Sequence, residues 1–185
     1  MAFTESNMIY LGTLAPDFNL PDTVSGKTVA YMDIQGPKGT LVIFLCNHCP
    51  YVIHVNEELV RLCNDFEKMG ISSVGISSND VDNYPDDAPD KMKIHAEQVG
   101  YPFPYLYDED QSVAKAYDAA CTPDFYLFDE NQTLYYRGRL DDSRPNSGKP
   151  LTGADLRAAA KAMLIGDPAP SKQFPSGGCN IKWKK

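Results

Sequence analysis

The sequence of 185 residues predicts a single α/β domain over 1–185, built on a central mixed sheet with flanking helices. Two patterns support this fold class. The apolar run 41–45, the helically spaced apolar residues of 52–69 and the apolar run 71–77 form a strand–helix–strand order, which implies a right-handed parallel crossover. The runs 121–129 and 133–139 flank a polar turn and predict an antiparallel pair. A sheet that contains both kinds of connection is mixed.

The remaining elements are assigned from turn residues and local periodicity. Residues 13–22 and 28–31 flank Gly26 and predict an N-terminal β-hairpin extension. After the second strand we expect a loop at 78–90, a helix at 91–99 that ends at Gly100, and a short strand at 105–107. A small helix at 112–117, a polar loop at 141–150 and an alanine-rich helix at 154–165 are expected further along the chain. The acidic loop 78–90 is interpreted as solvated surface rather than a metal site. Residues 167–185 are expected to form a C-terminal tail.

Composition and charge restrict the class of protein. Hydrophobic content of 43% and charged content of 23% are typical of a soluble globular protein. A net charge of −8 argues against nucleic acid or an anionic membrane as a partner, because both attract basic surfaces. Residues 1–14 lack the basic and apolar segments of a signal peptide, and no apolar run is long enough to span a membrane. An odd number of cysteines, five, fits a reducing compartment, so a cytoplasmic location is expected.

Two cysteines, Cys46 and Cys49, lie at the junction between the central strand and the following helix. Proline is favoured at the first helical position, so Pro50 makes Cys49 the expected N-cap. At that position the free backbone N–H groups and the helix dipole favour a thiolate over a thiol. We therefore expect Cys49 to attack a disulfide or a peroxide, and Cys46 to resolve the intermediate as an intramolecular disulfide.

Other interpretations of these residues stay open. A C-x-x-C pair can be half of a zinc site, although no second pair of ligands follows in the sequence, or it can be two inert core thiols. His48 lies between the cysteines, where an imidazolium would lower a cysteine pKa, or it is an exposed loop residue. His54, one helical turn further on, is another candidate for a residue near Cys49.

Four motifs spread over nearly the whole chain are informative together. They are A-P-D-F at 15–18, C-N-H-C-P-Y-V at 46–52, Thr122-Pro123, and a late Gly-Cys at 178–179 before a basic I-K-W-K end. In combination they resemble the alkyl hydroperoxide reductase and thiol-specific antioxidant (AhpC/TSA) family, which has a thioredoxin-like fold. This resemblance implies a cis peptide bond before Pro123, facing the redox helix, with Thr122 and Pro123 at the place where a substrate chain pairs.

The resemblance gives two alignments of the redox cysteines. Aligning Phe44 with the strand phenylalanine of thioredoxin puts Cys49 at the first cysteine of that protein, whereas aligning the two C-x-x-C motifs puts Cys46 there. The helix-start argument favours Cys49 as the attacking thiol. Peroxiredoxins carry Pro and Thr upstream of the peroxidatic cysteine, and neither alignment supplies that pair, so rapid peroxidase activity is not expected.

Four more residues are candidate neighbours of the pair or structural residues. If Pro123 is cis, Cys121 lies near the pair, as a third redox thiol or a buried neighbour. Cys179, in a tail that could move, resembles the distal resolving cysteine of some peroxiredoxins, or it is incidental. Arg137, at a predicted strand end, either favours a thiolate or peroxide through its charge or faces solvent. Cys63, beside the apolar stripe of the helix, is expected to be structural.

These observations indicate a thiol–disulfide oxidoreductase acting in redox homeostasis or antioxidant defence, with Cys46 and Cys49 as its redox pair. The alternatives are a slow thiol-dependent peroxidase and a metal-binding or redox-sensing interaction module. The expected partners are a protein or small-molecule disulfide or peroxide substrate and a cellular thiol reductant, and an oligomer is compatible with the sequence. No organic cofactor and no bound metal are expected.

Overall fold

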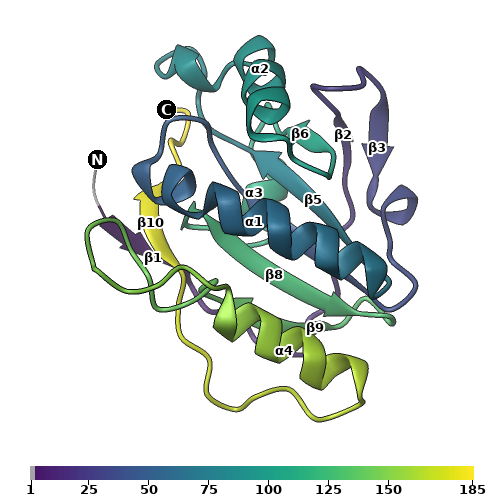
Figure 1. Cartoon of the computed structure of the whole chain (residues 1–185). Coiled ribbons are helices and arrows are strands. Elements are labelled where there is room, and N and C mark those ends of the chain that lie inside the picture. Colours follow the sequence, from purple (N-terminus) through teal and green to yellow (C-terminus); the bar gives the residue numbers. More distant parts are fainter. Residues whose placement is uncertain (1–2) are drawn as a thin grey trace.

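A five-stranded mixed sheet forms the centre of the computed structural model, which describes residues 3–185 (Figure 1). Its order is β6 (Tyr105–Tyr107), β5 (Ile71–Ser77), β4 (Gly39–Phe44), β8 (Asp124–Asp129) and β9 (Leu134–Gly138). The first three strands are parallel, and β8 runs antiparallel to both β4 and β9. The predicted parallel crossover and antiparallel pair are therefore both confirmed.

The two faces of the sheet are covered by different elements, because successive side chains of a strand point to opposite faces. Leu41 and Ile43 of β4 pack in the same apolar cluster as α1 (Pro50–Lys68), α2 (Pro89–Val99) and α4 (Ala154–Leu164). The alternate residues of β4, Val42 and Phe44, pack with α3 (Ser112–Ala116) and the N-terminal segment. The residues they meet there include Phe18, Tyr31, Val113 and Tyr117. Figure 1 shows α1 and α4 side by side on the first face. Each predicted helix is confirmed, including the stop of α2 at Gly100.

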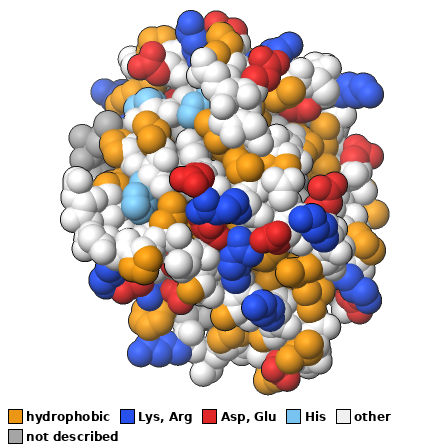
Figure 2. All heavy atoms as spheres, viewed as in Figure 1, with side chains coloured by type: hydrophobic (Ala, Val, Ile, Leu, Met, Phe, Trp, Pro, Cys, Tyr) orange, Lys and Arg blue, Asp and Glu red, His pale blue; other side chains and the backbone are white. Residues whose placement is uncertain are grey.

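Ion pairs join the two long helices of the first face. Arg157 of α4 reaches Glu58 of α1 at 2.7 Å and Asp65 at 2.9 Å. Figure 2 shows that basic and acidic side chains alternate over this face rather than forming one patch of a single sign. Over residues 3–185, the structure holds no helix with both the length and the apolar character needed to cross a membrane.

The expected hairpin precedes the central strand. Strand β2 (Asn19–Pro21) pairs with β3 (Thr28–Ala30) in an antiparallel register, and Gly26 takes a positive φ of 73° in the turn between them. A 3-10 turn, η1 (Tyr31–Asp33), follows, and η2 (Pro85–Asp87) and α3 (Ser112–Ala116) are the other short helices. The predicted hairpin is therefore confirmed, and the structure adds that it lies against the main sheet, since Leu20 and Tyr31 are buried in its second face.

A second sheet, absent from the sequence prediction, joins both ends of the chain. Strand β10 (Gly177–Asn180) lies between β1 (Phe3–Glu5) and β7 (Cys121–Thr122), antiparallel to each. The prediction of one continuous strand over 121–129 is wrong, because the chain leaves this small sheet at Pro123 and enters the large sheet at Asp124. The expectation of a tail that could move is also wrong for 177–181, which is paired and half-buried or buried. Gly-rich strands have little intrinsic preference for pairing, so tertiary contacts decide this element.

Replacing Leu59 by alanine tests the packing of α1 on the sheet. Leu59 is fully buried, so Leu59→Ala should lower the free energy of unfolding by about 2–5 kcal/mol through lost burial and a residual cavity. Ile53 on the same helix is 55% exposed, and Ile53→Ala should change that free energy by less than about 1 kcal/mol. Denaturant unfolding of both variants measures the difference, and equal losses would contradict the assigned packing of α1.

Candidate active site

The start of α1 positions the predicted attacking cysteine. Pro50 is the first helical residue, and Cys49 is the N-cap, with an extended backbone at φ −73° and ψ 123°. The carbonyl of Cys49 accepts the first helical hydrogen bond, from the N–H of Ile53 at 2.9 Å. The N–H of Val52 also contributes to stabilising a negative charge on the Cys49 sulfur. The prediction of Cys49 as N-cap is confirmed.

Both predicted redox cysteines meet the segment before the cis proline. The Thr122–Pro123 peptide bond is cis, as the resemblance implied. The Cys46 Sγ lies 3.2 Å from the Thr122 hydroxyl, and the Cys49 Sγ lies 3.3 Å from the Thr122 carbonyl oxygen. The helix start and the cis-proline segment therefore bring Cys46, Cys49 and Thr122 into one site.

The two sulfurs differ in acidity. A hydrogen bond from the Cys46 thiol is the largest factor that lowers the pKa of Cys49 to about 5, and a second comes from Cys179. The pKa of Cys46 is raised, first by that same hydrogen bond and then by burial. Near neutral pH the arrangement therefore favours a thiolate on Cys49 and a thiol on Cys46.

The lowered pKa of Cys49 links its ionisation to folding. The folded-state value lies below the value of roughly 8.5 for a free cysteine. The thiolate therefore stabilises the folded state fully above the unfolded pKa, and this contribution is lost as the pH falls through about 5.

His48 is held by a buried carboxylate rather than by the cysteines. Its Nδ1 lies 2.9 Å from Oδ2 of Asp87, which is completely buried. Asp87 also accepts hydrogen bonds from the backbone N–H of Asn47 at 2.8 Å and from the side chain of Asn79 at 2.7 Å. His48 is not among the main causes of the low pKa of Cys49. Its predicted effect on a cysteine therefore stays a prediction.

Asp87 corrects the interpretation of the acidic loop. Asp82, Asp86 and Asp90 are exposed as expected, but Asp80 and Asp87 are buried. Asp87 turns inward because it accepts a hydrogen bond from the N–H of Asn47 ahead of α1, whereas Asp80 accepts hydrogen bonds from Asp82 and Asn83 of its own loop. A sulfur of Cys46, a ring nitrogen of His48 and an oxygen of Asp87 lie within 4.8 Å of one another. This donor set is chemically suited to a cation such as Zn²⁺ if Cys46 is deprotonated.

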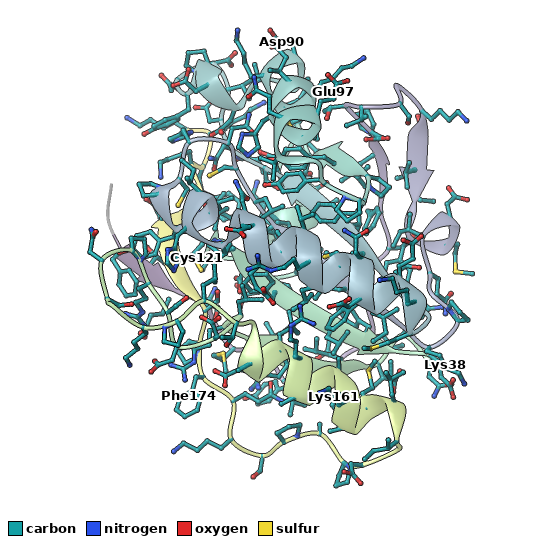
Figure 3. All side chains as sticks on the ribbon, viewed as in Figure 1. Lys38, Asp90, Glu97, Cys121, Lys161 and Phe174 are labelled. Atoms are coloured by element: carbon teal, nitrogen blue, oxygen red, sulfur yellow. The ribbon has the colours of Figure 1, made fainter. Side chains whose placement is uncertain are left out.

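The other cysteines have three different environments. Cys179 Sγ lies 2.7 Å from Cys49 Sγ, in contrast to the expectation of a thiol in a mobile tail. Cys121 is buried beside the site, and its thiol donates to the Pro123 carbonyl at 3.7 Å. Figure 3 shows Cys121 close to the start of α1 and strand β10. Cys63 is buried within α1, where desolvation raises its pKa to about 12, in line with the predicted structural role.

Arg137 and His54 do not contact the redox pair. The Arg137 guanidinium donates to the carbonyl oxygen of Ile9 and to the side chain of Gln173. It therefore joins the N-terminal and C-terminal segments and is half-buried rather than facing solvent, and an effect of its charge on the thiolate stays a prediction. His54 Nε2 lies 3.0 Å from the Ser143 hydroxyl, at a surface hollow that is also lined by Pro123.

A further buried acid, not predicted from the sequence, lies beside the site. Asp124 follows the cis proline and is fully buried, and desolvation raises its pKa to about 7. Its Oδ2 accepts a hydrogen bond from the Tyr126 hydroxyl at 3.0 Å. An acidic residue at the head of an otherwise apolar strand was the available signal, since buried carboxylates are rare outside functional or paired settings.

Comparison with known proteins supplies a family and closely related structures. The model of the AhpC/TSA family matches residues 11–137. The crystal structure of an uncharacterized conserved protein from Geobacillus kaustophilus is similar over the whole chain, with 57% identity and a TM-score of 0.97, and the match covers 97% of that protein. The chain is also 28% identical to the thiol-disulfide oxidoreductase ResA of Geobacillus thermodenitrificans strain NG80-2, over 70% of this chain and 69% of that protein.

More distant structures show the fold. A putative thioredoxin from Neisseria meningitidis superposes with a TM-score of 0.62 at 24% identity, over 84% of this chain and 93% of that one. The predicted thioredoxin-like fold is therefore confirmed, with its central mixed sheet and flanking helices.

The acidity of Cys49 can be measured directly. The ultraviolet absorbance of thiolates, followed from about pH 3 to about pH 8, should show one cysteine ionising near pH 5. Cys46→Ala removes the main hydrogen-bond donor and should raise this midpoint by about one to two pH units, whereas Cys46→Ser retains a donor and should raise it less. Cys63→Ser serves as the control. A wild-type midpoint near that of free cysteine would contradict the assignment.

Proposed function

The chain belongs to the AhpC/TSA family, and from this membership we propose that it is a thiol–disulfide oxidoreductase with Cys49 and Cys46 as its redox pair. The observation that carries the proposal is the Cys49 sulfur at the N-terminus of α1, where it and the Cys46 sulfur both contact Thr122 beside cis-Pro123. The related ResA proteins, named as thiol–disulfide oxidoreductases, support the same reaction class.

The reaction follows from the unequal acidity of the two sulfurs. The Cys49 thiolate attacks one sulfur of a substrate disulfide, forms a mixed disulfide and expels the other sulfur as a thiolate. That thiolate, or water, takes the proton of Cys46, whose sulfur then attacks Cys49. The substrate leaves as one thiol and one thiolate, which takes a proton from water, and the protein holds a Cys46–Cys49 disulfide. A cellular thiol reductant returns two electrons and the proton of Cys46 to complete the cycle.

Burial sets the conditions for this reaction. Cys46 and Cys49 are 1% and 0% exposed. Direct attack on a substrate therefore requires a movement of the segments that lie over the sulfurs, among them Thr122 and strand β10. We propose that the substrate is a small-molecule or protein disulfide that reaches the pair when these segments separate.

The setting of the reaction is part of the proposal. A reducing compartment such as the cytoplasm would keep the cysteines reduced between turnovers, and its thiol systems would supply the reductant. The net charge of −8 supports a partner other than nucleic acid or an anionic membrane.

A single-turnover assay tests the proposed pair. With a chromogenic disulfide and no reductant, the wild-type protein should release two thiols per chain, one from each step. Cys46→Ser should still release the first, because Cys49 retains its position, whereas Cys49→Ser should lose the rapid phase by about a hundredfold or more. Cys63→Ser is the matched control, since its sulfur is buried about four helical turns along α1 from Cys49 and its loss should leave the rapid phase unchanged.

The outcomes separate the alternatives. If rapid release of the first thiol survives in Cys49→Ser and disappears in Cys46→Ser, the attacking role belongs to Cys46. Rates no faster than those of free cysteine in the wild type would overturn the oxidoreductase proposal. A parallel assay with hydrogen peroxide compares the two reactions, and a sulfenic acid on Cys49 that forms faster than disulfide exchange would make the peroxidase the main activity.

A further inference from the structure

Strand β10 brings a third sulfur, that of Cys179, against the redox pair. The Cys179 and Cys49 sulfurs lie 2.7 Å apart, approaching the bond length of about 2.05 Å in a disulfide. Cys179 is only 4% exposed, so this contact lies inside the protein. Both cysteines are free thiols in the structure, and a bond between them needs only a small further approach.

The backbone of β10 is built to make this close contact. Cys179 lies opposite Thr122 of β7 on one side and Phe3 of β1 on the other. A Cβ atom on Gly178 would lie 2.0 Å from the Thr122 carbonyl oxygen, so only glycine permits this approach of the strands. The position of Cys179 is therefore a consequence of strand pairing.

The chain is also anchored on each side of Cys179. Before it, the Ser176 hydroxyl donates to the Pro123 carbonyl at 2.6 Å. After it, the N–H of Ile181 donates to the Ala120 carbonyl at 3.1 Å, and the Ile181 side chain is 1% exposed. These contacts hold the third sulfur at the site in the reduced protein.

We propose that Cys179 is a third redox thiol and that the oxidised protein carries a Cys49–Cys179 disulfide, which ties β10 to the start of α1. This inference rests on the proposed oxidoreductase function and deepens it. It predicts that the second sulfur in the reaction is Cys179, either directly or after Cys46.

The chemistry balances in both routes. In the direct route, Cys49 carries a mixed disulfide with the substrate. Cys179 attacks the Cys49 sulfur and expels the substrate sulfur as a thiolate. That thiolate takes the proton of Cys179, and the substrate is then fully reduced. In the indirect route, Cys179 attacks Cys49 within a Cys46–Cys49 disulfide, and Cys46 leaves with the proton, so no net electron transfer occurs. An external dithiol supplies the two electrons and two protons that reduce the Cys49–Cys179 bond.

Cys121 provides an internal comparison. It is equally buried and lies opposite Asn180 of the same strand β10, but its thiol donates to the Pro123 carbonyl. A buried cysteine at this sheet is therefore not sufficient for the proposed role, and contact with the Cys49 sulfur is the distinguishing feature.

Peptide mapping of the oxidised protein tests the inference. The wild type is treated with one equivalent of oxidised glutathione, free thiols are alkylated in acid denaturant, and trypsin is added without reductant. Cys46 and Cys49 share the tryptic peptide 39–61, whereas Cys179 lies in 173–182. The expected main product is a cross-link between these two peptides. It should persist in Cys121→Ser and be absent from Cys179→Ser, and its presence or absence in Cys46→Ser distinguishes the direct route from the indirect one.

The outcomes distinguish this inference from the function on which it rests. An active wild type that contains only a disulfide internal to peptide 39–61 would overturn the role of Cys179 and leave the oxidoreductase intact. A cross-link that persists in Cys49→Ser would assign the bond to Cys46 and also overturn it. A wild type that neither exchanges disulfides nor forms any internal bond would overturn the oxidoreductase proposal itself.

Gly178→Ala tests the same inference without removing a sulfur. The added Cβ would clash with the Thr122 carbonyl and push β10 away from β7. The cross-link between peptides 39–61 and 173–182 should fall at least about fivefold, which corresponds to roughly 1 kcal/mol. The disulfide internal to 39–61 in the same digest is the control and should be retained. An unchanged cross-link in a protein that folds like the wild type would contradict the role of strand pairing.

Discussion

The packing of the N-terminus of α1 against the Thr122–Pro123 segment is the contact on which the site depends. Thr122 meets both sulfurs of the predicted pair, through its hydroxyl at Cys46 and its carbonyl at Cys49. The same residue pairs with Cys179 of β10. One short segment between two sheets therefore determines the relative positions of three sulfurs. Any change that separates this segment from α1 would alter the acidity of Cys49, the attack of a second cysteine on Cys49 and the access of substrate together.

Burial and ionisation oppose each other at Cys49. Desolvation of a charged sulfur raises its pKa, and hydrogen bonds from Cys46 and Cys179 offset this cost. These hydrogen bonds stabilise the reduced protein only. When Cys49 forms a disulfide, its negative charge is lost and one of the two donor thiols is consumed. A reduced form stabilised in this way makes the corresponding disulfide a stronger oxidant. The cluster of thiols thus favours the return of the oxidised cysteines to their reduced form by the cellular thiol reductant of the proposed cycle.

The sequence predicted those helices and strands that have a periodic apolar pattern or a recognisable first residue. Pro50 marked the start of α1, and the apolar runs located β4 and β5. The sequence could not reveal β10, because Gly177–Asn180 has no apolar alternation and pairs only when both chain ends meet. Asp87 was hidden for a similar reason, since a polar loop gives no sign of which carboxylate turns inward. The contact of Arg137 with Ile9 was not predicted, because strand position does not fix where a long side chain binds.

Cys46 belongs to two groups with incompatible requirements. It donates the hydrogen bond that stabilises the Cys49 thiolate, so the redox pair needs its proton. It also lies with His48 and Asp87 in a set of donors that could bind a cation only after that proton is lost. The buried Asp87 carboxylate disfavours a second negative charge and is one cause of the raised pKa of Cys46. Without a cation, Asp87 therefore adds to the hydrogen bond with Cys49 and to burial in keeping Cys46 protonated, which favours its role in the redox pair over a role as a ligand.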